Sequence, residues 1–189
     1  REARIRTVGK PYVENDLKIV DEEGQDVAQG AVGEIIMRPS QLVMGGGYYR
    51  DLKNSIAAWH DPYYRLGDLG MIDDSGNLIL VGRATELIIR GGQNVVPAEV
   101  EELLISHPKV VDVAVVGLPD EELGERICAC VILDDGESLS LDETRAHFRA
   151  LGVANFKCPE RIEVVEEFPI AMSGFKIDRM RLVEILTAG

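Results

Sequence analysis

One lysine near the end of the chain stands in a setting that could support chemistry. The stretch PIAMSGFKIDR (Pro169–Arg179) places Lys176 two residues after Gly174, just before a segment that is typical of a short basic helix. A lysine ammonium carries a full positive charge and three hydrogen-bond donors, so it can neutralise an anion that reaches the loop. Taken alone, however, a lysine in a loop is usually a solvated surface residue. The rest of the sequence has to decide between these two interpretations.

The three cysteines and three histidines give a weaker signal. Cys128 and Cys130 alternate in the apolar run RICACVIL, so on a strand both would lie on one face about 7 Å apart. A metal or redox pair is one alternative, but no further cysteine or histidine cluster completes such a site. We therefore expect buried strand cysteines and no metal centre.

Composition limits the classes of function. The chain has 189 residues, with 20 Lys and Arg against 33 Asp and Glu, and a formal net charge of −13. A phosphate backbone favours a basic surface, so we expect no nucleic-acid partner. No apolar run approaches the roughly 20 residues of a membrane span. The chain begins at Arg1 without a signal peptide, so we expect a piece of a longer, cytoplasmic protein.

The first part of the chain predicts antiparallel β-structure. In YVENDLKIV, apolar and polar residues alternate as in a strand with one buried face: Val13, Leu17 and Ile19 against Glu14, Asp16 and Lys18. GEIIMR predicts a short strand and DEEG a turn. GMIDDSGNLILVG predicts a hairpin with DDSGN at its turn, and a loop containing MGGGYY joins these pieces.

From Gly82 the pattern changes. ELIIR predicts a strand, GGQN a glycine turn into a helix, and Pro97 the first position of that helix. Its apolar stripe comprises Val100, Leu103 and Leu104. VVDVAVVGL and RICACVIL are continuous apolar runs, which is typical of central strands buried on both faces.

The last third predicts two helices and one strand. Ser140 and Glu143 form a capping box, after which Leu141, Phe148 and Leu151 keep helical spacing. RIEVVEEF predicts a strand and DRMRLVEIL a closing helix. The order is β-α-β-β-α-β-α from about residue 86. The expected fold class is therefore α+β: an antiparallel β subdomain over residues 1–85, followed by a small α+β domain over residues 86–189.

Four motifs, in the same order, resemble those of the adenylate-forming (AMP-binding) enzymes: acyl- and aryl-CoA ligases, adenylation domains of peptide synthetases, and luciferases. They are GEIIMRPSQLVMGGGYY, YRLGD, GRATELIIRGGQNVVPAEVEE and SGFKIDR. The resemblance covers the whole chain, from the end of the large N-terminal AMP-binding domain through the mobile C-terminal domain. It implies a ligase that joins a carboxylic acid to ATP and then passes the acyl group to a thiol, usually coenzyme A. The first step is an in-line attack on the α-phosphate, so catalysis rests on positioning and charge neutralisation.

The resemblance assigns nucleotide roles to two residues. Asp68 of YRLGD would accept hydrogen bonds from both ribose hydroxyls of ATP, one on each carboxylate oxygen; otherwise it is a turn aspartate. Arg83 of GRATE would bind ribose or phosphate oxygens with its planar fork; otherwise it is a surface arginine. Leu66 stands where the family usually has threonine.

Glu86 falls where the family has its hinge. The resemblance implies that the C-terminal domain pivots there to exchange its adenylation face for its thioester-forming face. A hinge residue absorbs backbone rotation without taking part in the chemistry, so we expect no catalytic role for Glu86.

The resemblance identifies Lys176, through the register K-I-D-R, as the adenylation lysine that bridges the carboxylate and the α-phosphate. Two unit charges about 4 Å apart interact by about 4 kcal/mol at an effective dielectric constant of about 20, which corresponds to about a thousandfold in rate. Phe175 stands where the family usually has glycine, with Gly174 one place earlier. We therefore expect this loop to follow a somewhat different path.

Two further segments would serve the thiol. Gly91 and Gly92 of RGGQNV match the loop that lines the pantetheine tunnel, although a simple strand-to-helix turn would also explain them. Lys157 and Arg161 of NFKCPER could contact phosphates of coenzyme A, or be surface residues whose stems lie along a strand edge. Glu99 more simply stabilises the start of its helix.

The resemblance places the family's phosphate loop, adenine platform and acyl pocket upstream of Arg1, and no GxxxxGK(S/T) substitute occurs. We therefore expect Mg²⁺ to be held mainly by the N-terminal domain, and these 189 residues alone to be inactive. The expected partners are that domain, ATP, coenzyme A and a small carboxylic acid. In a second interpretation the chain is a binding module that docks a carrier protein. LGERICACVIL and LGVANFKCPERIEVVEEFP resemble aryl- or alicyclic-acid-activating members.

Overall fold

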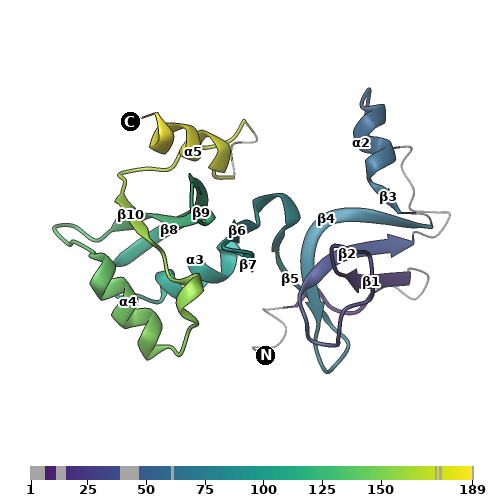
Figure 1. Cartoon of the computed structure of the whole chain (residues 1–189), viewed down its shortest axis with the longest axis horizontal. Coiled ribbons are helices and arrows are strands. Elements are labelled where there is room, and N and C mark those ends of the chain that lie inside the picture. Colours follow the sequence, from purple (N-terminus) through teal and green to yellow (C-terminus); the bar gives the residue numbers. More distant parts are fainter. Residues whose placement is uncertain are drawn as a thin grey trace. The chain divides into compact units, whose positions relative to one another are not determined.

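The computed structural model describes residues 7–11, 16–38, 47–60, 62–172, 174 and 176–188. Its chain divides into two compact units, Arg1–Thr85 and Glu86–Gly189 (Figure 1). Val13, Glu14 and Phe175, which figure in the sequence predictions, lie outside the described residues, as do the first three residues of MGGGYY. None of the described helices is long and apolar enough to cross a membrane.

The first unit is built on one antiparallel sheet. Its strands are β1 (Asp16–Val20), β2 (Gly33–Arg38), β3 (Trp59–His60), β4 (Tyr63–Ile72) and β5 (Leu78–Arg83). The order is β1-β2-β4-β3, and β5 pairs with β4. The predicted strand GEIIMR and the hairpin around DDSGN are confirmed, and the Asp73 carboxylate accepts the backbone N–H groups of Ser75 and Asn77 at that turn.

The first unit also contains a helix, α2 (Leu52–Ala57), that the sequence did not predict. Asp51 caps it by accepting the N–H of Asn54. None of its residues is buried, and its six residues are too few for a helical apolar period to be recognised.

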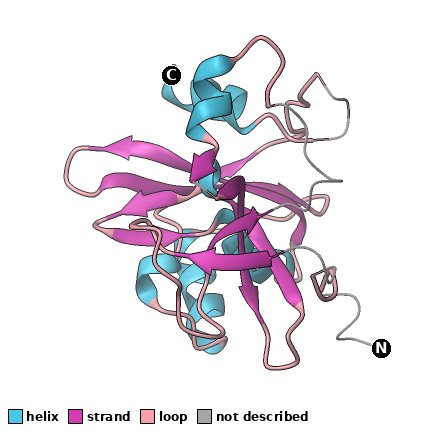
Figure 2. Ribbon diagram, turned by 90° about the vertical axis from the view of Figure 1, so that its right-hand side faces the viewer, coloured by secondary structure: helices cyan, strands magenta, loops and turns pink. Residues whose placement is uncertain are grey.

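The second unit is a mixed sheet between helices. Its strands are β6 (Ile88–Arg90), β7 (Gln93–Val95), β8 (Val110–Asp120), β9 (Gly124–Leu133) and β10 (Arg161–Val164), and its helices are α3 (Pro97–Ile105), α4 (Leu141–Ala150) and α5 (Arg179–Thr187). The strand order is β10-β9-β6-β7, with β8 on β9; only β10 runs parallel to its neighbour, β9. Helices α3 and α4 lie on one face of this sheet and α5 on the other (Figures 1 and 2).

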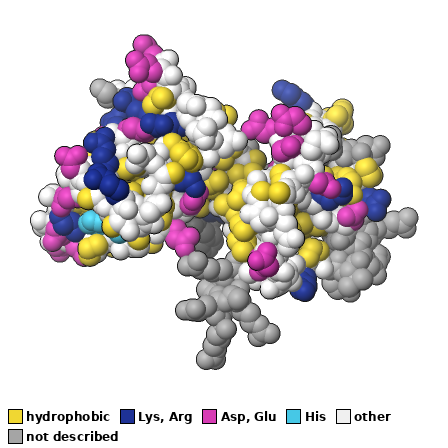
Figure 3. Space-filling view, turned by 60° about the horizontal axis from the view of Figure 1, so that its bottom comes forward, with side chains coloured by type: hydrophobic (Ala, Val, Ile, Leu, Met, Phe, Trp, Pro, Cys, Tyr) yellow, Lys and Arg dark blue, Asp and Glu magenta, His cyan; other side chains and the backbone are white. Residues whose placement is uncertain are grey.

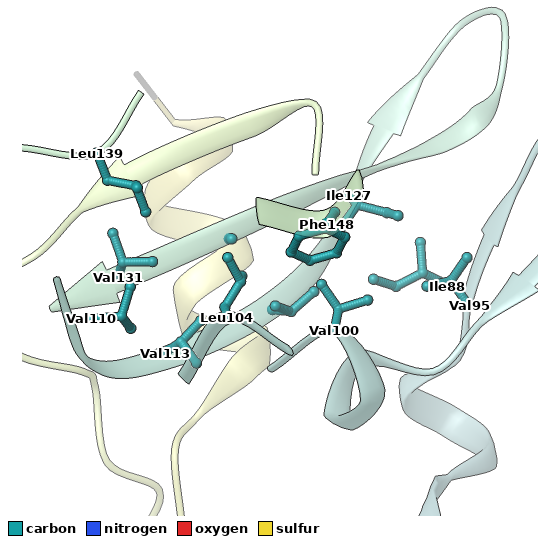
Figure 4. Packing of buried hydrophobic residues seen from close by; sticks show 12 residues of the cluster. Ile88, Val95, Val100, Leu104, Val110, Val113, Ile127, Val131, Leu139 and Phe148 are labelled. Atoms are coloured by element: carbon teal, nitrogen blue, oxygen red, sulfur yellow. The ribbon is translucent and has the colours of Figure 1, made fainter. Parts of the chain in front are cut away.

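Both faces of β8 and β9 are buried, as their continuous apolar runs predicted. Val113, Val115 and Ile127 belong to the core beneath α3 and α4, where Phe148 of α4 also packs (Figure 4). Ala114 and its neighbours on the opposite face pack against α5. The alternation of side chains along a strand supplies both cores from one run of residues.

Cys128 and Cys130 lie on the α5 face and are fully buried. The hydrogen bond to the Cys128 thiol and burial both raise the pKa of Cys130, which keeps it a thiol. Within the described residues no group of three or more His, Cys, Asp or Glu is placed to hold a metal ion. The two cysteines therefore belong to the core.

Helices α3 and α4 begin as the sequence predicts. Pro97 occupies the first turn of α3, and Ser140 and Glu143 form both hydrogen bonds of a capping box at α4. Phe148 is buried, whereas Leu151, which keeps the helical register as the C-cap of α4, is 49% exposed. Thr144, whose hydroxyl donates to the Ser140 carbonyl, takes the buried position instead.

Candidate functional site

Asp68 and Arg83 lie opposite each other in the antiparallel pair of β4 and β5. Arg83 Nε is 3.0 Å from Asp68 Oδ1, and both side chains remain partly exposed. A carboxylate has about four acceptor positions, so this ion pair leaves acceptor capacity for other donors. The cross-strand pair therefore fixes the orientation of the carboxylate without occupying it.

Leu66, two residues before Asp68, packs against the core of the first unit, which contains Ile19, Ile35 and Leu78. This packing gives the leucine a structural role. A polar side chain at the same position would face this apolar cluster.

Glu86 ends a short 3₁₀ turn after β5 and is the first residue of the second unit. Its Oε2 lies 3.2 Å from Nε of Arg179, the first residue of α5. The side chain at the unit boundary is thus attached to the second unit.

Arg179 is the centre of a larger cluster. Its Nη1 donates to Glu101 Oε1 at 2.6 Å and to the Val115 carbonyl at 3.0 Å, and its Nη2 donates to Glu101 Oε2 at 3.2 Å. The Val115 N–H donates to Glu101 Oε1 at 2.7 Å. Burial opposes the charge of Arg179, but its bonds to Glu101 and Glu86 outweigh burial and raise its pKa.

This cluster also provides hydrogen-bond partners for the backbone N–H and carbonyl of Val115 on the outer edge of β8. Among the described strands β8 pairs only with β9, so Val115 would otherwise leave a donor and an acceptor unpaired. The Glu101 carboxylate and the Arg179 guanidinium replace the carbonyl and amide of a missing strand. Helices α3 and α5 are thereby joined to the sheet.

Lys176 is exposed, on a loop that is closed by backbone hydrogen bonds. Ile170 and Ile177 form an antiparallel bridge, and the Lys176 carbonyl accepts the N–H of Ala171 at 2.8 Å. The N–H of Asp178 donates to the Pro169 carbonyl at 2.7 Å, and Asp178 caps α5. The loop therefore holds the lysine backbone while its side chain projects from the surface.

Gly91 and Gly92 form the two-residue turn of a β6–β7 hairpin, because Arg90 pairs with Gln93. The predicted direct passage from this turn into a helix is wrong, since β7 intervenes. Both glycines have positive φ, 55° and 76°, as a type I′ turn requires. The turn accounts for both glycines, and its N–H at Gly91 donates to the Leu123 carbonyl at 2.8 Å.

Lys157 and Arg161 are each paired with an acid. Lys157 Nζ lies 2.5 Å from Oε1 of Glu99 in the first turn of α3, and Arg161 Nε lies 2.5 Å from Glu163 Oε1. Glu99 thus links α3 to the NFKCPER segment besides lying where a negative charge suits the helix dipole. The negative charge of each acid offsets the positive charge of its partner, so each pair is neutral overall.

Two arginines that the sequence analysis did not single out line a cavity of about 370 Å³ beside this segment. Its lining comprises Arg145, Phe148, Arg149, Val153, Asn155 and Cys158. Arg145 pairs with the exposed Asp142 at 3.3 Å, while no ion pair is found for Arg149 in the described parts of the chain. Basic side chains also gather on the face of the second unit in Figure 3. The 145, 148 and 149 spacing in α4, which puts all three on one helix face, was the available signal.

Sequence comparisons support a family relationship. Residues 99–174 match the family model described as AMP-binding enzyme C-terminal domain. A salicylyl-CoA synthase / salicylate adenylyltransferase of Streptomyces sp is 38% identical over 97% of the chain, and a mitochondrial medium-chain acyl-CoA ligase of Bos taurus is 36% identical over 97%. The chain spans 33% and 29% of these proteins, about a third of their length.

The structural comparison agrees. The amide bond synthetase McbA from Marinactinospora thermotolerans matches 98% of the chain with a TM-score of 0.84 and 32% identity, and the chain covers 37% of it. The predicted α+β architecture is confirmed by this match. The chain corresponds to the C-terminal part of acyl-CoA synthetase-like, adenylate-forming enzymes, and its residues 99–174 belong to the family of their C-terminal domain.

Proposed function

We propose that the full-length protein containing this sequence is an ATP-dependent carboxylic acid–CoA ligase that forms an acyl-adenylate and then a thioester. The observation that carries the proposal is the setting of Lys176. An exposed ammonium stands on a loop closed by the Ile170–Ile177 bridge, so a full charge is offered from a held backbone. Such a charge offsets the repulsion between a carboxylate and the α-phosphate that it attacks.

The nucleotide would be held partly by Asp68 and Arg83. The Asp68 carboxylate would accept hydrogen bonds from the two ribose hydroxyls at its free acceptor positions. Arg83, whose Nε lies 3.0 Å from Asp68 Oδ1, keeps this carboxylate oriented. ATP would supply the adenylyl group, with Mg²⁺ bound mainly by the N-terminal domain. These residues by themselves bind and orient; in this proposal only Lys176 touches the reacting atoms.

Thioester formation would use the second unit differently. We assign the pivot between the two steps to the boundary at Glu86, and the pantetheine contact to the Gly91–Gly92 turn. Phosphates of coenzyme A would meet Arg145 and Arg149 in the cavity, together with Lys157 and Arg161. Lys157, Arg161 and Arg145 are each paired with an acid, so Arg149, for which the described residues show no ion pair, is the stronger source of net charge in the cavity.

The alternative acceptor is a carrier protein, and the acid is either aromatic or aliphatic. Incubation of the full-length protein with ATP, coenzyme A and a panel of aromatic and medium-chain acids, followed by mass spectrometry, tests both points. We expect acyl-CoA and AMP with at least one acid. Acyl transfer to a carrier but not to coenzyme A would contradict the ligase assignment. We propose a cytoplasmic location. Because one relative is described as mitochondrial, cell fractionation should check this location.

A further inference from the structure

The proposed function assigns the two reaction steps to two surfaces of the second unit. A separate network of ion pairs lies next to each of these surfaces. One centres on Arg179 and lies next to the Lys176 loop. The other centres on Glu160 and lies next to the Gly91–Gly92 turn. We propose that Arg179 is the positioning residue of the adenylation step and Glu160 the positioning residue of the thioester step. This inference rests on the proposed function.

The Arg179 network fixes the C-terminal end of the lysine loop. Arg179 lies three positions after Lys176, and its guanidinium is bound at once to Glu101, Glu86 and the Val115 carbonyl of β8. The Ala171 N–H donates to the Lys176 carbonyl and the Asp178 N–H to the Pro169 carbonyl, so the backbone of Lys176 is tied to the residues that lead into α5. The position of Lys176 therefore depends on the bonds of Arg179.

The Glu160 network joins the two segments assigned to the thiol. Glu160 Oε1 binds Nε of Arg90, the residue just before the Gly91–Gly92 turn. Its Oε2 accepts the Ile127 N–H at 2.8 Å, and its own N–H donates to the Ile127 carbonyl at 3.0 Å. Glu160 lies in the NFKCPER segment. One carboxylate thus sets the distance between the glycine turn and the segment that carries Lys157.

The networks have no residue in common and are attached to different strands. Arg179 is bound to β8 at Val115, whereas Glu160 is bound to β9 at Ile127. All the members are partly buried except Glu86, which is 41% exposed, so each bond is shielded from salt more than a surface pair is. Loss of one network should therefore leave the other intact.

The test compares Arg179→Gln and Glu160→Gln in the full-length protein, with each step measured separately. Acid-dependent ATP–pyrophosphate exchange reports adenylation, and single-turnover thioester formation from added acyl-adenylate and coenzyme A reports the second step. We expect Arg179→Gln to slow exchange by about tenfold or more, and Glu160→Gln to slow thioester formation by about tenfold or more. In each variant the other step should change by less than about twofold. Arg179→Lys, which keeps the charge but loses the planar fork, should recover little of the exchange rate.

Arg181, two residues after Arg179, and Glu166, six residues after Glu160, are both exposed, so Arg181→Gln and Glu166→Gln are the matched controls. They should leave both steps unchanged. A general loss of stability would slow both steps equally in Arg179→Gln and Glu160→Gln, and that result, or no change in either step, would overturn the proposal.

Hydrogen exchange measured by mass spectrometry separates this inference from the proposed function. Arg179→Gln should raise the amide hydrogen-exchange rate in residues 169–178 and leave it unchanged in residues 90–95. Glu160→Gln should raise the rate in residues 90–95 and leave it unchanged in residues 169–178. If the wild type formed no adenylate with any acid, the proposed function would fail. The exchange pattern would still decide whether the two networks act separately, and equal exchange changes in both segments would refute that.

Discussion

At the residue scale, the partners of each cation decide which candidates offer charge to a ligand. Lys157 and Arg161 are each within 2.5 Å of a carboxylate oxygen, so an incoming phosphate has to compete with Glu99 and Glu163 for them. Lys176 is exposed and stands on a closed loop, and Arg149 lines a cavity. Sequence alone showed the charges, but their neutralisation depends on residues up to 58 positions away in the chain.

Asp68 gives the first prediction at this scale. Asp68→Asn removes the charge that binds Arg83 and one of the two equivalent acceptor oxygens, so the KM for ATP should rise by about tenfold or more. Steady-state kinetics of the full-length protein at saturating acid would measure this change. Asp74→Asn, an exposed residue in the same hairpin, serves as the control. A KM for ATP unchanged in Asp68→Asn would remove Asp68 from the nucleotide site.

Glu143 gives a prediction of pH dependence. A hydrogen bond from Lys109, together with the Ser140 N–H and hydroxyl, lowers its pKa from 4.5 to about 2. Because the folded state favours the ionised form, this carboxylate stabilises the protein above about pH 4.5, and the stabilisation is lost as pH falls toward about 2.

Glu143→Gln should therefore lower the Tm at about pH 7 and have little effect on it at about pH 2. Thermal unfolding of both proteins across this range would show the difference. An equal Tm difference at both ends of the range would mean that the ionisation of Glu143 does not stabilise the fold.

At the element scale, the sequence was most informative where one local rule sufficed. The capping box at Ser140, the proline start of α3 and the doubly buried strands β8 and β9 follow from short stretches of sequence. Helix α2 and strand β7 were missed because the first buries nothing and the second has three residues. Both are held by local hydrogen bonds and turn geometry more than by apolar periodicity.

The ion pairs between elements lay beyond sequence reasoning for a different reason. Arg179 is quoted in the motif SGFKIDR, yet its partners Glu101 and Glu86 come from α3 and from the unit boundary. Which acid meets which base depends on how α5 lies on β8. The candidate site residues could therefore be named from their motifs, while the contacts that position them required the fold.

The cavity beside α4 carries the prediction at this scale. Replacing Arg145 and Arg149 together by glutamine should raise the KM for coenzyme A by about tenfold or more, because the two charges that we propose for its phosphates are lost. ATP–pyrophosphate exchange should stay the same. Arg181→Gln is the matched arginine control on α5. An unchanged KM for coenzyme A in the double variant would show that the acceptor binds elsewhere.

At the scale of the whole molecule, the chain is two compact units that meet at Glu86. Asp68 and Arg83 lie in the first unit, and Lys176 and the glycine turn lie in the second. A reaction in two steps, with a pivot at the boundary, would use one rigid second unit twice by presenting different surfaces. The side chain of Glu86 binds Arg179 within the second unit, so we place the rotation in the backbone before Glu86.

The most direct measurement of the central claim compares wild-type full-length protein with Lys176→Ala in both half-reactions. Loss of the bridging charge should slow acid-dependent ATP–pyrophosphate exchange by about a thousandfold. Thioester formation from added acyl-adenylate should remain within about threefold of wild type, because the α-phosphate bond has already formed. An ATP–pyrophosphate exchange rate in Lys176→Ala equal to that of the wild type, or a slowing of both steps by the same factor, would contradict the account.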